Sequence, residues 1–254
     1  MVRNDAFLAR VEEAGLNASA TSRQMMYDGW LMRTSPGKAQ RARCINAIAP
    51  ARLGLDNKLR FAQAHYAARE LPLLFRITPF SEPHNLDNEL AARGYTQFED
   101  TRVMVGELEV PPIIVPLTHN ATLEACDAVH FAETVGQLRG TPAPARAAHA
   151  KRLAEAPDHA LRVAITLDNE PVAAGQCIME DGLVGLYDII TAPELRGQGL
   201  GSTVITWLLS KAHAHGARAV YLQVDGANEA ARSLYAALGL TDRYAYHYRM
   251  PGGQ

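Results

Sequence analysis

The residues best suited to chemistry lie in one short segment that is rich in glycine. It runs Pro193-Glu194-Leu195-Arg196-Gly197-Gln198-Gly199-Leu200-Gly201, between an apolar run and a long apolar helical pattern. Glycine accepts positive φ and lets the backbone approach a ligand without a Cβ in the way. The free N–H groups and the dipole at the start of the following helix favour an anion. The segment therefore predicts a turn that binds a phosphate or pyrophosphate, with Ser202 and Thr203 adding hydroxyls or capping the helix.

Two familiar nucleotide-binding turns fit this segment less well. A phosphate-binding loop of the NTPase type ends in Gly-Lys-Ser/Thr, and no lysine follows a glycine in this segment. The dinucleotide pattern Gly-x-Gly-x-x-Gly is approached by Gly197, Gly199 and Ser202, with Asp225 at a ribose-binding distance along the chain. A dinucleotide fold normally opens with a unit of strand, glycine turn, helix and strand and continues through several more strands, whereas only one further strand follows that unit here. An NAD(P)-binding oxidoreductase is therefore kept as the alternative.

The same segment resembles the GNAT superfamily of acyl-CoA N-acyltransferases. The signature Arg/Gln-x-x-Gly-x-Gly/Ala of that family is matched by Arg196, Gly199 and Gly201, and its Pro-Glu-x-Arg-Gly turn begins at Pro193. A second family signature, Asn-x-x-Ala-x-x-Leu-Tyr-x-x-x-Gly-Phe, follows at the usual separation. Its matches are Asn228, Ala231, Leu234, Tyr235 and Gly239, with Leu240 in place of the usual phenylalanine. The resemblance covers about Ile113 to Met250.

The resemblance implies an N-acetyltransferase that uses acetyl-CoA as co-substrate. A primary amine would attack the thioester directly, and Tyr235 would protonate the departing thiolate as general acid. A tyrosine hydroxyl suits this role because it stays protonated at neutral pH. Without the surrounding motif, Tyr235 would be interpreted as packing of an apolar helix. A non-catalytic acyl-CoA sensor is a further alternative.

The resemblance also assigns coenzyme contacts. The strand before the glycine turn is expected to diverge from its neighbour and to bind the pantetheine arm through its backbone, while amides of the turn hold the pyrophosphate. Asn228 is expected at the coenzyme or as a helix cap. The expected coenzyme-binding residues are Ile189, Ile190, Thr191, Arg196, Gly197, Gln198, Gly199, Leu200, Gly201, Ser202 and Asn228.

A general base is harder to derive from the sequence. Asp188 interrupts an apolar run and is the candidate we select, with Tyr187 as its neighbour. Strand alternation predicts that the two side chains lie on opposite faces. His130, Glu133 and Arg139, near the predicted acceptor side, are interpreted as surface residues.

The elements that must position these residues follow from periodicity and turn signals. Asp168 to Pro171 and Asp181-Gly182 predict hairpin turns. The predicted strands of the second half are Ile113–Leu117, Leu161–Leu167, Val172–Met179, Leu183–Thr191, Ala219–Val224 and Tyr244–Met250. The predicted helices are Asn120–Glu133, Ala145–Ala156, Gly201–His215 and Asn228–Leu238.

The first half repeats this order in a weaker form, which predicts a duplication. After a helix over Met1–Gly15, its predicted elements are a strand at Arg41–Ile48, a helix at Asp56–Glu70, a strand at Leu73–Thr78 and a helix at Asn85–Gly94. Only Gly54 precedes its second helix, so we expect a degenerate copy.

Two prolines after Val110 mark the boundary between the copies. The predicted fold is α/β of the α+β type, with two GNAT-like domains over residues 1–110 and 111–254. Each is a mixed, mainly antiparallel twisted sheet flanked by helices. We expect Trp30, Arg33, Phe75 and Arg76 of the first copy to help wall the acceptor site.

Composition restricts the partners. A formal net charge of −2 gives no field toward nucleic acid or a membrane surface. Three separated cysteines argue against a disulfide framework and a metal site, and no segment has the roughly 20 apolar residues that cross a bilayer. The expected protein is cytoplasmic, takes a small-molecule or peptide amine as acceptor, and leaves a homodimer open.

Overall fold

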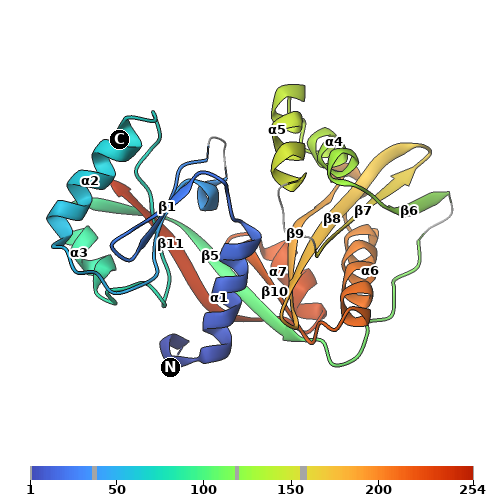
Figure 1. The fold of residues 1–254 in the computed structure, drawn as a ribbon. Coiled ribbons are helices and arrows are strands. Elements are labelled where there is room, and N and C mark those ends of the chain that lie inside the picture. The colour runs from blue at the N-terminus through green and yellow to red at the C-terminus, as the bar shows by residue number, and fades with distance from the viewer. Residues whose placement is uncertain (1, 36–38, 118–119, 155–158, 254) are drawn as a thin grey trace. The chain divides into compact units, whose positions relative to one another are not determined.

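The computed structural model describes residues 2–35, 39–117, 120–154 and 159–253 (Figure 1). The chain forms two compact units that interleave along the sequence. The first contains Met1–Val103, Val224–Glu229 and Asp242–Gln254, and the second contains Met104–Gln223 and Ala230–Thr241. We retain as a proposal that the two copies of the sequence meet between residues 110 and 111.

The first unit is a mixed sheet with helices. Its strands follow the hydrogen-bonded order β1-β2-β3-β4-β11-β5. Neighbours β3 and β4 are parallel, whereas the pairs β1–β2, β2–β3 and β4–β11 are antiparallel. The elements are α1 (Ala6–Ala18), β1 (Gln24–Tyr27), β2 (Trp30–Arg33), β3 (Ile45–Ala47), α2 (Leu55–Ala67), β4 (Phe75–Ile77), α3 (Leu86–Ala92), β5 (Tyr95–Glu107) and β11 (Thr241–Pro251), with short 3-10 turns at Val2–Asn4 and Gln40–Ala42.

The second unit repeats this plan on a larger scale. Its strand order is β5-β10-β9-β8-β7-β6, where β5 contributes residues to both units. Strands β9 and β10 are parallel, and the pairs from β6 to β9 are antiparallel. The elements are β6 (Ala121–Ala125), α4 (Ala128–Leu138), α5 (Ala143–Ala154), β7 (Ala160–Leu167), β8 (Glu170–Glu180), β9 (Leu183–Thr191), a 3-10 turn (Pro193–Leu195), α6 (Leu200–Ala214), β10 (Ala219–Asp225) and α7 (Glu229–Ala237).

These observations confirm the predicted mixed, mainly antiparallel architecture. In each unit a helix joins two parallel neighbours, α2 between β3 and β4 and α6 between β9 and β10. Both hairpins of the second unit turn where predicted, with positive φ at Asp168 (51°), Asn169 (68°), Asp181 (47°) and Gly182 (76°). Such two-residue turns match the twist of antiparallel strands.

The tyrosine-rich final strand differs from its prediction. It was expected to close the second half, but β11 pairs with β4, with His247 opposite Ile77 and Arg249 opposite Phe75. The first unit therefore contains a strand from the end of the chain, and the sequence pattern of β11 does not specify which neighbour it joins.

The prediction for residues 113–133 was wrong in part. Ile113–Leu117 is not a strand, because Pro111, Pro112 and Pro116 lack backbone N–H groups, and Ile113 is 91% exposed. The strand is instead β6, and α4 begins at Ala128 after Asp127, whose carboxylate accepts the His130 N–H. Of the predicted helix Ala145–Ala156, the last two residues lie outside the described residues.

In the second unit, helices cover both faces of the sheet. Ala174 of β8 belongs to a core cluster with Phe131 and Val135 of α4, whereas a Cβ on the adjacent Gly175 would lie 2.5 Å from Val204 of α6. Neighbouring residues of a strand face opposite sides. Helices α4 and α5 therefore pack on one face and α6 on the other, as Figure 1 shows.

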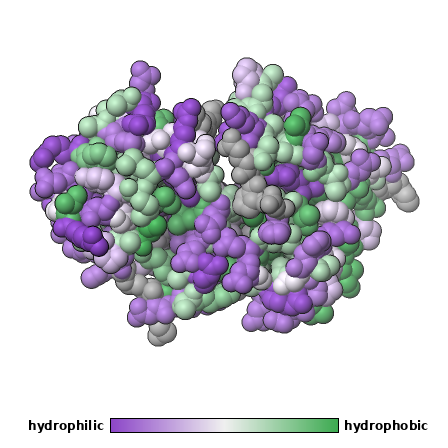
Figure 2. Space-filling model, viewed as in Figure 1, coloured by the Kyte–Doolittle hydropathy of each residue, from purple (hydrophilic) through white to green (hydrophobic). Residues whose placement is uncertain are grey.

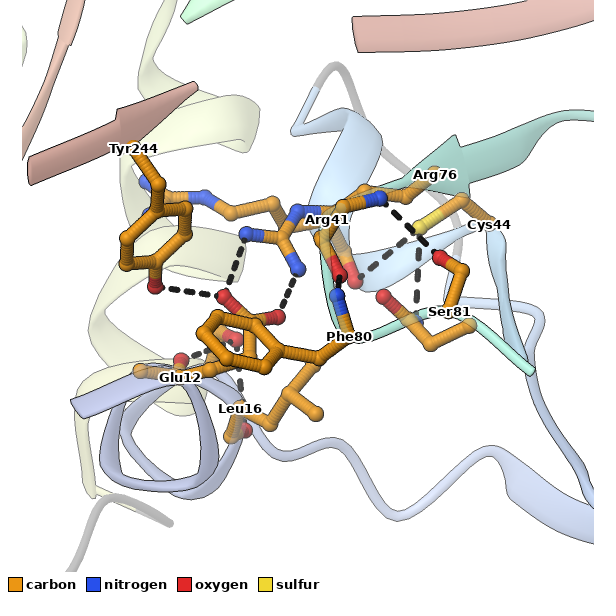
Figure 3. A network of polar contacts seen from close by, with 12 residues as sticks. Glu12, Leu16, Arg41, Cys44, Arg76, Phe80, Ser81 and Tyr244 are labelled. Atoms are coloured by element: carbon orange, nitrogen blue, oxygen red, sulfur yellow. Dashed lines mark hydrogen bonds and ion pairs between the residues drawn. The ribbon is translucent and has the colours of Figure 1, made fainter. Parts of the chain in front are cut away.

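In the first unit, a buried polar network holds α1 against the sheet (Figure 3). The guanidinium of Arg76 donates to both carboxylate oxygens of Glu12, and the Tyr244 hydroxyl donates to the same carboxylate at 2.7 Å. The Arg76 guanidinium also lies 3.8 Å over the Tyr246 ring. A buried charge needs such partners because removal from water is costly.

This burial contradicts the expectation that four residues of the first copy wall the acceptor site. Each is at most 2% exposed and belongs to the interior of the first unit: Trp30, Arg33, Phe75 and Arg76. They stabilise this unit and are inaccessible to a solute.

The surface is mostly polar on the face drawn in Figure 2, with apolar residues in small patches. In the described ranges, no helix has both the length and the apolar character needed to span a membrane. Among these same residues, no group of His, Cys, Asp and Glu is arranged to hold a metal ion.

Candidate active site

The glycine turn adopts the conformation that its composition predicts. Gly197 and Gly199 have φ values of 77° and 86°, in the left-handed region that side chains disfavour. Gly199 is the N-cap of α6, and its side-chain-free position leaves the first helical N–H groups without a capping side chain. Those N–H groups have no acceptor within the helix. Arg196, Gly197 and Gln198 are exposed, so an anion can approach the turn from solvent.

Three elements converge on the start of α6. A Cβ built on Gly201 would lie 3.5 Å from the Thr191 hydroxyl at the end of β9 and 3.6 Å from Leu234 of α7. Tyr235 follows Leu234 directly. The turn, the end of β9 and the helix that carries Tyr235 are therefore adjacent within the second unit.

Strand β9 leaves the ladder with β10 before it reaches the turn. The parallel pairing joins Leu183–Leu186 to Ala219–Leu222 and stops there. Beyond Leu186, β9 continues through Tyr187–Thr191 and remains paired with β8 on its other edge. The backbone groups of this segment that point away from β8 are available to an extended ligand.

A β-bulge reshapes this segment at Asp188. Gln176 is paired with Tyr187 and Ala174 with Ile190, so Gly175 opposes two residues of β9. Asp188 has φ 51°. Gln176 and Tyr187 share a face because they are cross-strand partners, and Gln176 also contacts Asp188. The prediction that Tyr187 and Asp188 face opposite sides was therefore wrong, because the bulge interrupts alternation.

The Asp188 carboxylate is the centre of a polar cluster under α4 and α5. It accepts a hydrogen bond from Arg139 at 2.7 Å and from the Gln176 amide at 2.9 Å. The His149 Nε2 lies 3.8 Å from Asp188 Oδ2. Burial opposes ionisation of Asp188, but Arg139, His149 and Gln176 outweigh it and hold the pKa of the carboxyl below its usual value.

Sequence reasoning missed two members of this cluster, Gln176 and His149. Gln176 is a polar interruption of the apolar strand β8, which is the signal that marks it. His149 is one histidine on an alanine-rich helix, and nothing in the sequence points it at Asp188. Arg139 lies at the surface as predicted, with 44% of its side chain exposed, and it also forms an ion pair with Asp188.

Tyr235 is buried, with 8% of its surface exposed. Burial raises the pKa of its hydroxyl, so the group holds its proton throughout the neutral range. Asn228 directly precedes α7, the position of a helix N-cap.

In the first unit, the loop that corresponds to the glycine turn binds a carboxylate of the protein itself. Before α2, the Asp28 carboxylate accepts the backbone N–H groups of Arg52 at 2.9 Å and Leu53 at 2.9 Å. Buried Lys58 lies 3.4 Å from the same carboxylate. Gly54 has φ −63°, unlike the glycines of the second turn. The first copy is therefore degenerate at this loop, as predicted, because its N–H groups are already bound and its glycine is not left-handed.

Comparisons with known proteins identify the family of the chain and its fold. The profile of the Acetyltransferase (GNAT) family matches residues 131–240. The chain is 30% identical over 227 residues to the uncharacterized N-acetyltransferase YobR of Bacillus subtilis (strain 168), covering 87% of this chain and 89% of that protein.

Two solved structures share the fold. A GCN5-related N-acetyltransferase from Kribbella flavida has a TM-score of 0.72 and 19% identity, covering 97% of this chain and 96% of that one. A tandem GNAT protein from the clavulanic acid biosynthesis pathway has a TM-score of 0.61 and 15% identity, covering 76% and 68%.

The fold is the α+β fold of these acetyltransferases. The chain belongs to the GNAT family and is an N-acetyltransferase. Members of this family take their acyl group from acyl-CoA.

Proposed function

We propose that this protein transfers an acetyl group from acetyl-CoA to a primary amine by direct attack, with the second unit as the catalytic one. The observation that carries the proposal is the glycine turn, where left-handed Gly197 and Gly199 open the start of α6 beside the unpaired edge of β9. An anionic pyrophosphate suits the helix start, and an extended pantetheine arm suits a strand edge.

The donor would contact two groups of residues. Arg196 to Ser202 would hold the pyrophosphate, mainly through backbone N–H groups. Ile189, Ile190 and Thr191 would bind the pantetheine arm along the edge that β10 leaves. Asn228 would contact the coenzyme while capping α7.

Tyr235 would act as the general acid. In the reaction, the amine nitrogen bonds to the thioester carbonyl carbon and the carbon–sulfur bond breaks. The Tyr235 hydroxyl would give its proton to the departing thiolate, a role that its raised pKa and the contact of Leu234, its neighbour in α7, with the start of α6 support.

Asp188 would remain part of the acceptor side of the site. Its lowered pKa makes the carboxylate a weak base at neutral pH, so its charge would act mainly on neighbouring groups. The alternative of an NAD(P)-dependent oxidoreductase loses its support, since the family is that of acetyltransferases. A non-catalytic acyl-CoA sensor would bind acetyl-CoA in the same way but would not transfer the acetyl group to an amine.

The test is release of free coenzyme A thiol from acetyl-CoA in the presence of a panel of amines that includes polyamines, amino acids, aminoglycosides and peptide N-termini. Acetylated product confirmed by mass spectrometry for at least one amine is the expected result. Tight binding of acetyl-CoA with no amine acetylated across the panel would favour the sensor.

A further inference from the structure

His149 is the group in the second unit whose chemistry the proposed transfer does not yet use. It lies on α5, its Nε2 faces Asp188 of the β9 bulge, and 16% of its side chain is exposed to solvent. The Nε2 to Asp188 Oδ2 separation of 3.8 Å exceeds hydrogen-bond length and lies within reach of an ion pair.

We propose that His149 is the base that takes a proton from the acceptor amine, and that Asp188 stabilises the imidazolium that forms. This inference rests on the proposed transfer and names the proton acceptor that the transfer needs. His149 would be the catalytic residue, with Asp188 and Gln176 as positioning residues.

The contacts of Asp188 favour it as a fixed negative charge and leave the role of proton acceptor to His149. Arg139 and Gln176 already occupy the Asp188 carboxylate, which therefore holds negative charge and takes up protons poorly. The Gln176 Oε1 atom is buried and has no hydrogen-bond partner among the described residues. Turning the amide around would place that oxygen against the carboxylate, so the observed orientation fixes Asp188 as an acceptor.

Burial is the main cause that favours the neutral imidazole of His149 before the reaction. Burial lowers the pKa of His149, Asp188 opposes this shift, and Arg152, Arg139 and Arg162 lower the pKa further. A histidine with a pKa below 6.5 is largely unprotonated at pH 7 and free to accept a proton. The nearby carboxylate then compensates the new charge.

The proton balance is complete with the residues present. An ammonium loses two protons when it becomes an amide. The first would pass to His149, leaving a neutral amine whose lone pair attacks the thioester carbonyl, and would go on to solvent. The second leaves the new amide nitrogen and replaces the proton that Tyr235 gives to sulfur.

The experiment compares His149→Gln with His130→Gln, a matched histidine replacement on the exposed side of α4. Calorimetric binding of acetyl-CoA first checks that each variant is folded and loads the donor. The rate of transfer to an amine found in the panel is then measured from pH 5 to 9, and His149→Ala is assayed with and without free imidazole.

The proposal expects kcat/KM to fall about 100-fold in His149→Gln, with donor affinity unchanged. The limb of the wild-type pH profile that lies below pH 6.5 would disappear, and imidazole would restore activity to His149→Ala. His130→Gln would behave as wild type.

An unchanged acid limb in His149→Gln, or a rate within threefold of wild type, would overturn the assignment. So would a slow variant whose acid limb persists and that imidazole does not rescue, because that pattern belongs to a structural role. If wild-type protein binds acetyl-CoA but acetylates no amine, the proposed transfer itself fails and this inference falls with it.

Discussion

The Asp28 carboxylate accepts the backbone N–H of Leu53 at 2.9 Å, and in doing so it fills the anion position of the first unit. Asp28 stands in the β1–β2 hairpin turn, and Leu53 lies in the loop before α2. In the second unit, the loop before α6 instead carries Gly197 and Gly199 with positive φ. The two copies thus differ at the loop before the helix: in the first unit a carboxylate of the protein occupies the loop N–H groups, whereas the second unit leaves them to a bound anion.

This difference predicts one coenzyme per chain. Acetyl-CoA would bind with a stoichiometry of one, because the Asp28 charge repels a pyrophosphate and already occupies the loop amides. Calorimetric titration measures the stoichiometry directly. Two equivalent sites per chain would contradict the assignment of Asp28.

Asp28 also predicts a pH dependence of stability. The N–H groups of Leu53 and Arg52, and then Lys58, hold the pKa of this carboxyl below its usual value against the effect of burial. A depressed pKa stabilises the folded state above the unfolded value of about 3.9, and that stability is lost as pH falls through the folded pKa. Urea unfolding should show wild type more stable than Asp28→Asn at pH 6, with a smaller difference at pH 3. A larger difference in the free energy of unfolding between wild type and Asp28→Asn at pH 3 than at pH 6 would contradict this prediction.

The buried Glu12–Arg76 pair predicts a large loss of stability on substitution. Glu12→Gln leaves the Arg76 guanidinium without its counter-charge and should lower the free energy of unfolding by about 3–5 kcal/mol. Glu13→Gln on the same helix removes an exposed ion pair with Arg10 and should cost at most about 1 kcal/mol. Equal effects in urea unfolding would show that the network of Figure 3 is not a main support of the first unit.

Tyr235→Phe separates catalysis from packing. The ring remains, so stability and acetyl-CoA affinity should change little, whereas kcat should fall about 100-fold through loss of the proton donor. Steady-state transfer rates and a thermal melt measure the two effects. Loss of stability with normal kcat would assign Tyr235 to the core alone.

Local sequence patterns specified much of the second unit. The hairpins at Asp168-Asn169 and Asp181-Gly182, the glycine turn and α6 all follow from turn residues and periodicity over a few positions. The segment after Pro112 was misassigned because apolar Ile113 and Ile114 suggest a strand, whereas the prolines around them prevent one.

The polar cluster around Asp188 could not be predicted from local sequence, because its members come together only in the folded chain. Asp188 was selected because it interrupts an apolar run, yet its bulge depends on the register between β8 and β9. Arg139 is the C-cap of α4 and His149 lies on α5, 10 residues further along the sequence. Their approach to Asp188 depends on how these two helices pack. The position of β11 beside β4 likewise depends on pairing over more than 160 residues of sequence, which local patterns do not encode.

The most direct test of the central claim is calorimetric titration of the intact protein with acetyl-CoA, in wild type and in a Gly197→Ala, Gly199→Ala double variant. Gly182→Ala is the matched control, since Gly182 has φ 76° in a hairpin turn and, like Gly197, open space around its Cβ position. A left-handed non-glycine residue costs about 1–2 kcal/mol, so the turn of the double variant should relax away from its binding conformation. We expect wild type and Gly182→Ala to bind alike and the double variant to bind at least tenfold more weakly. Failure of folded wild type to bind, or equal binding by the double variant, would contradict the account.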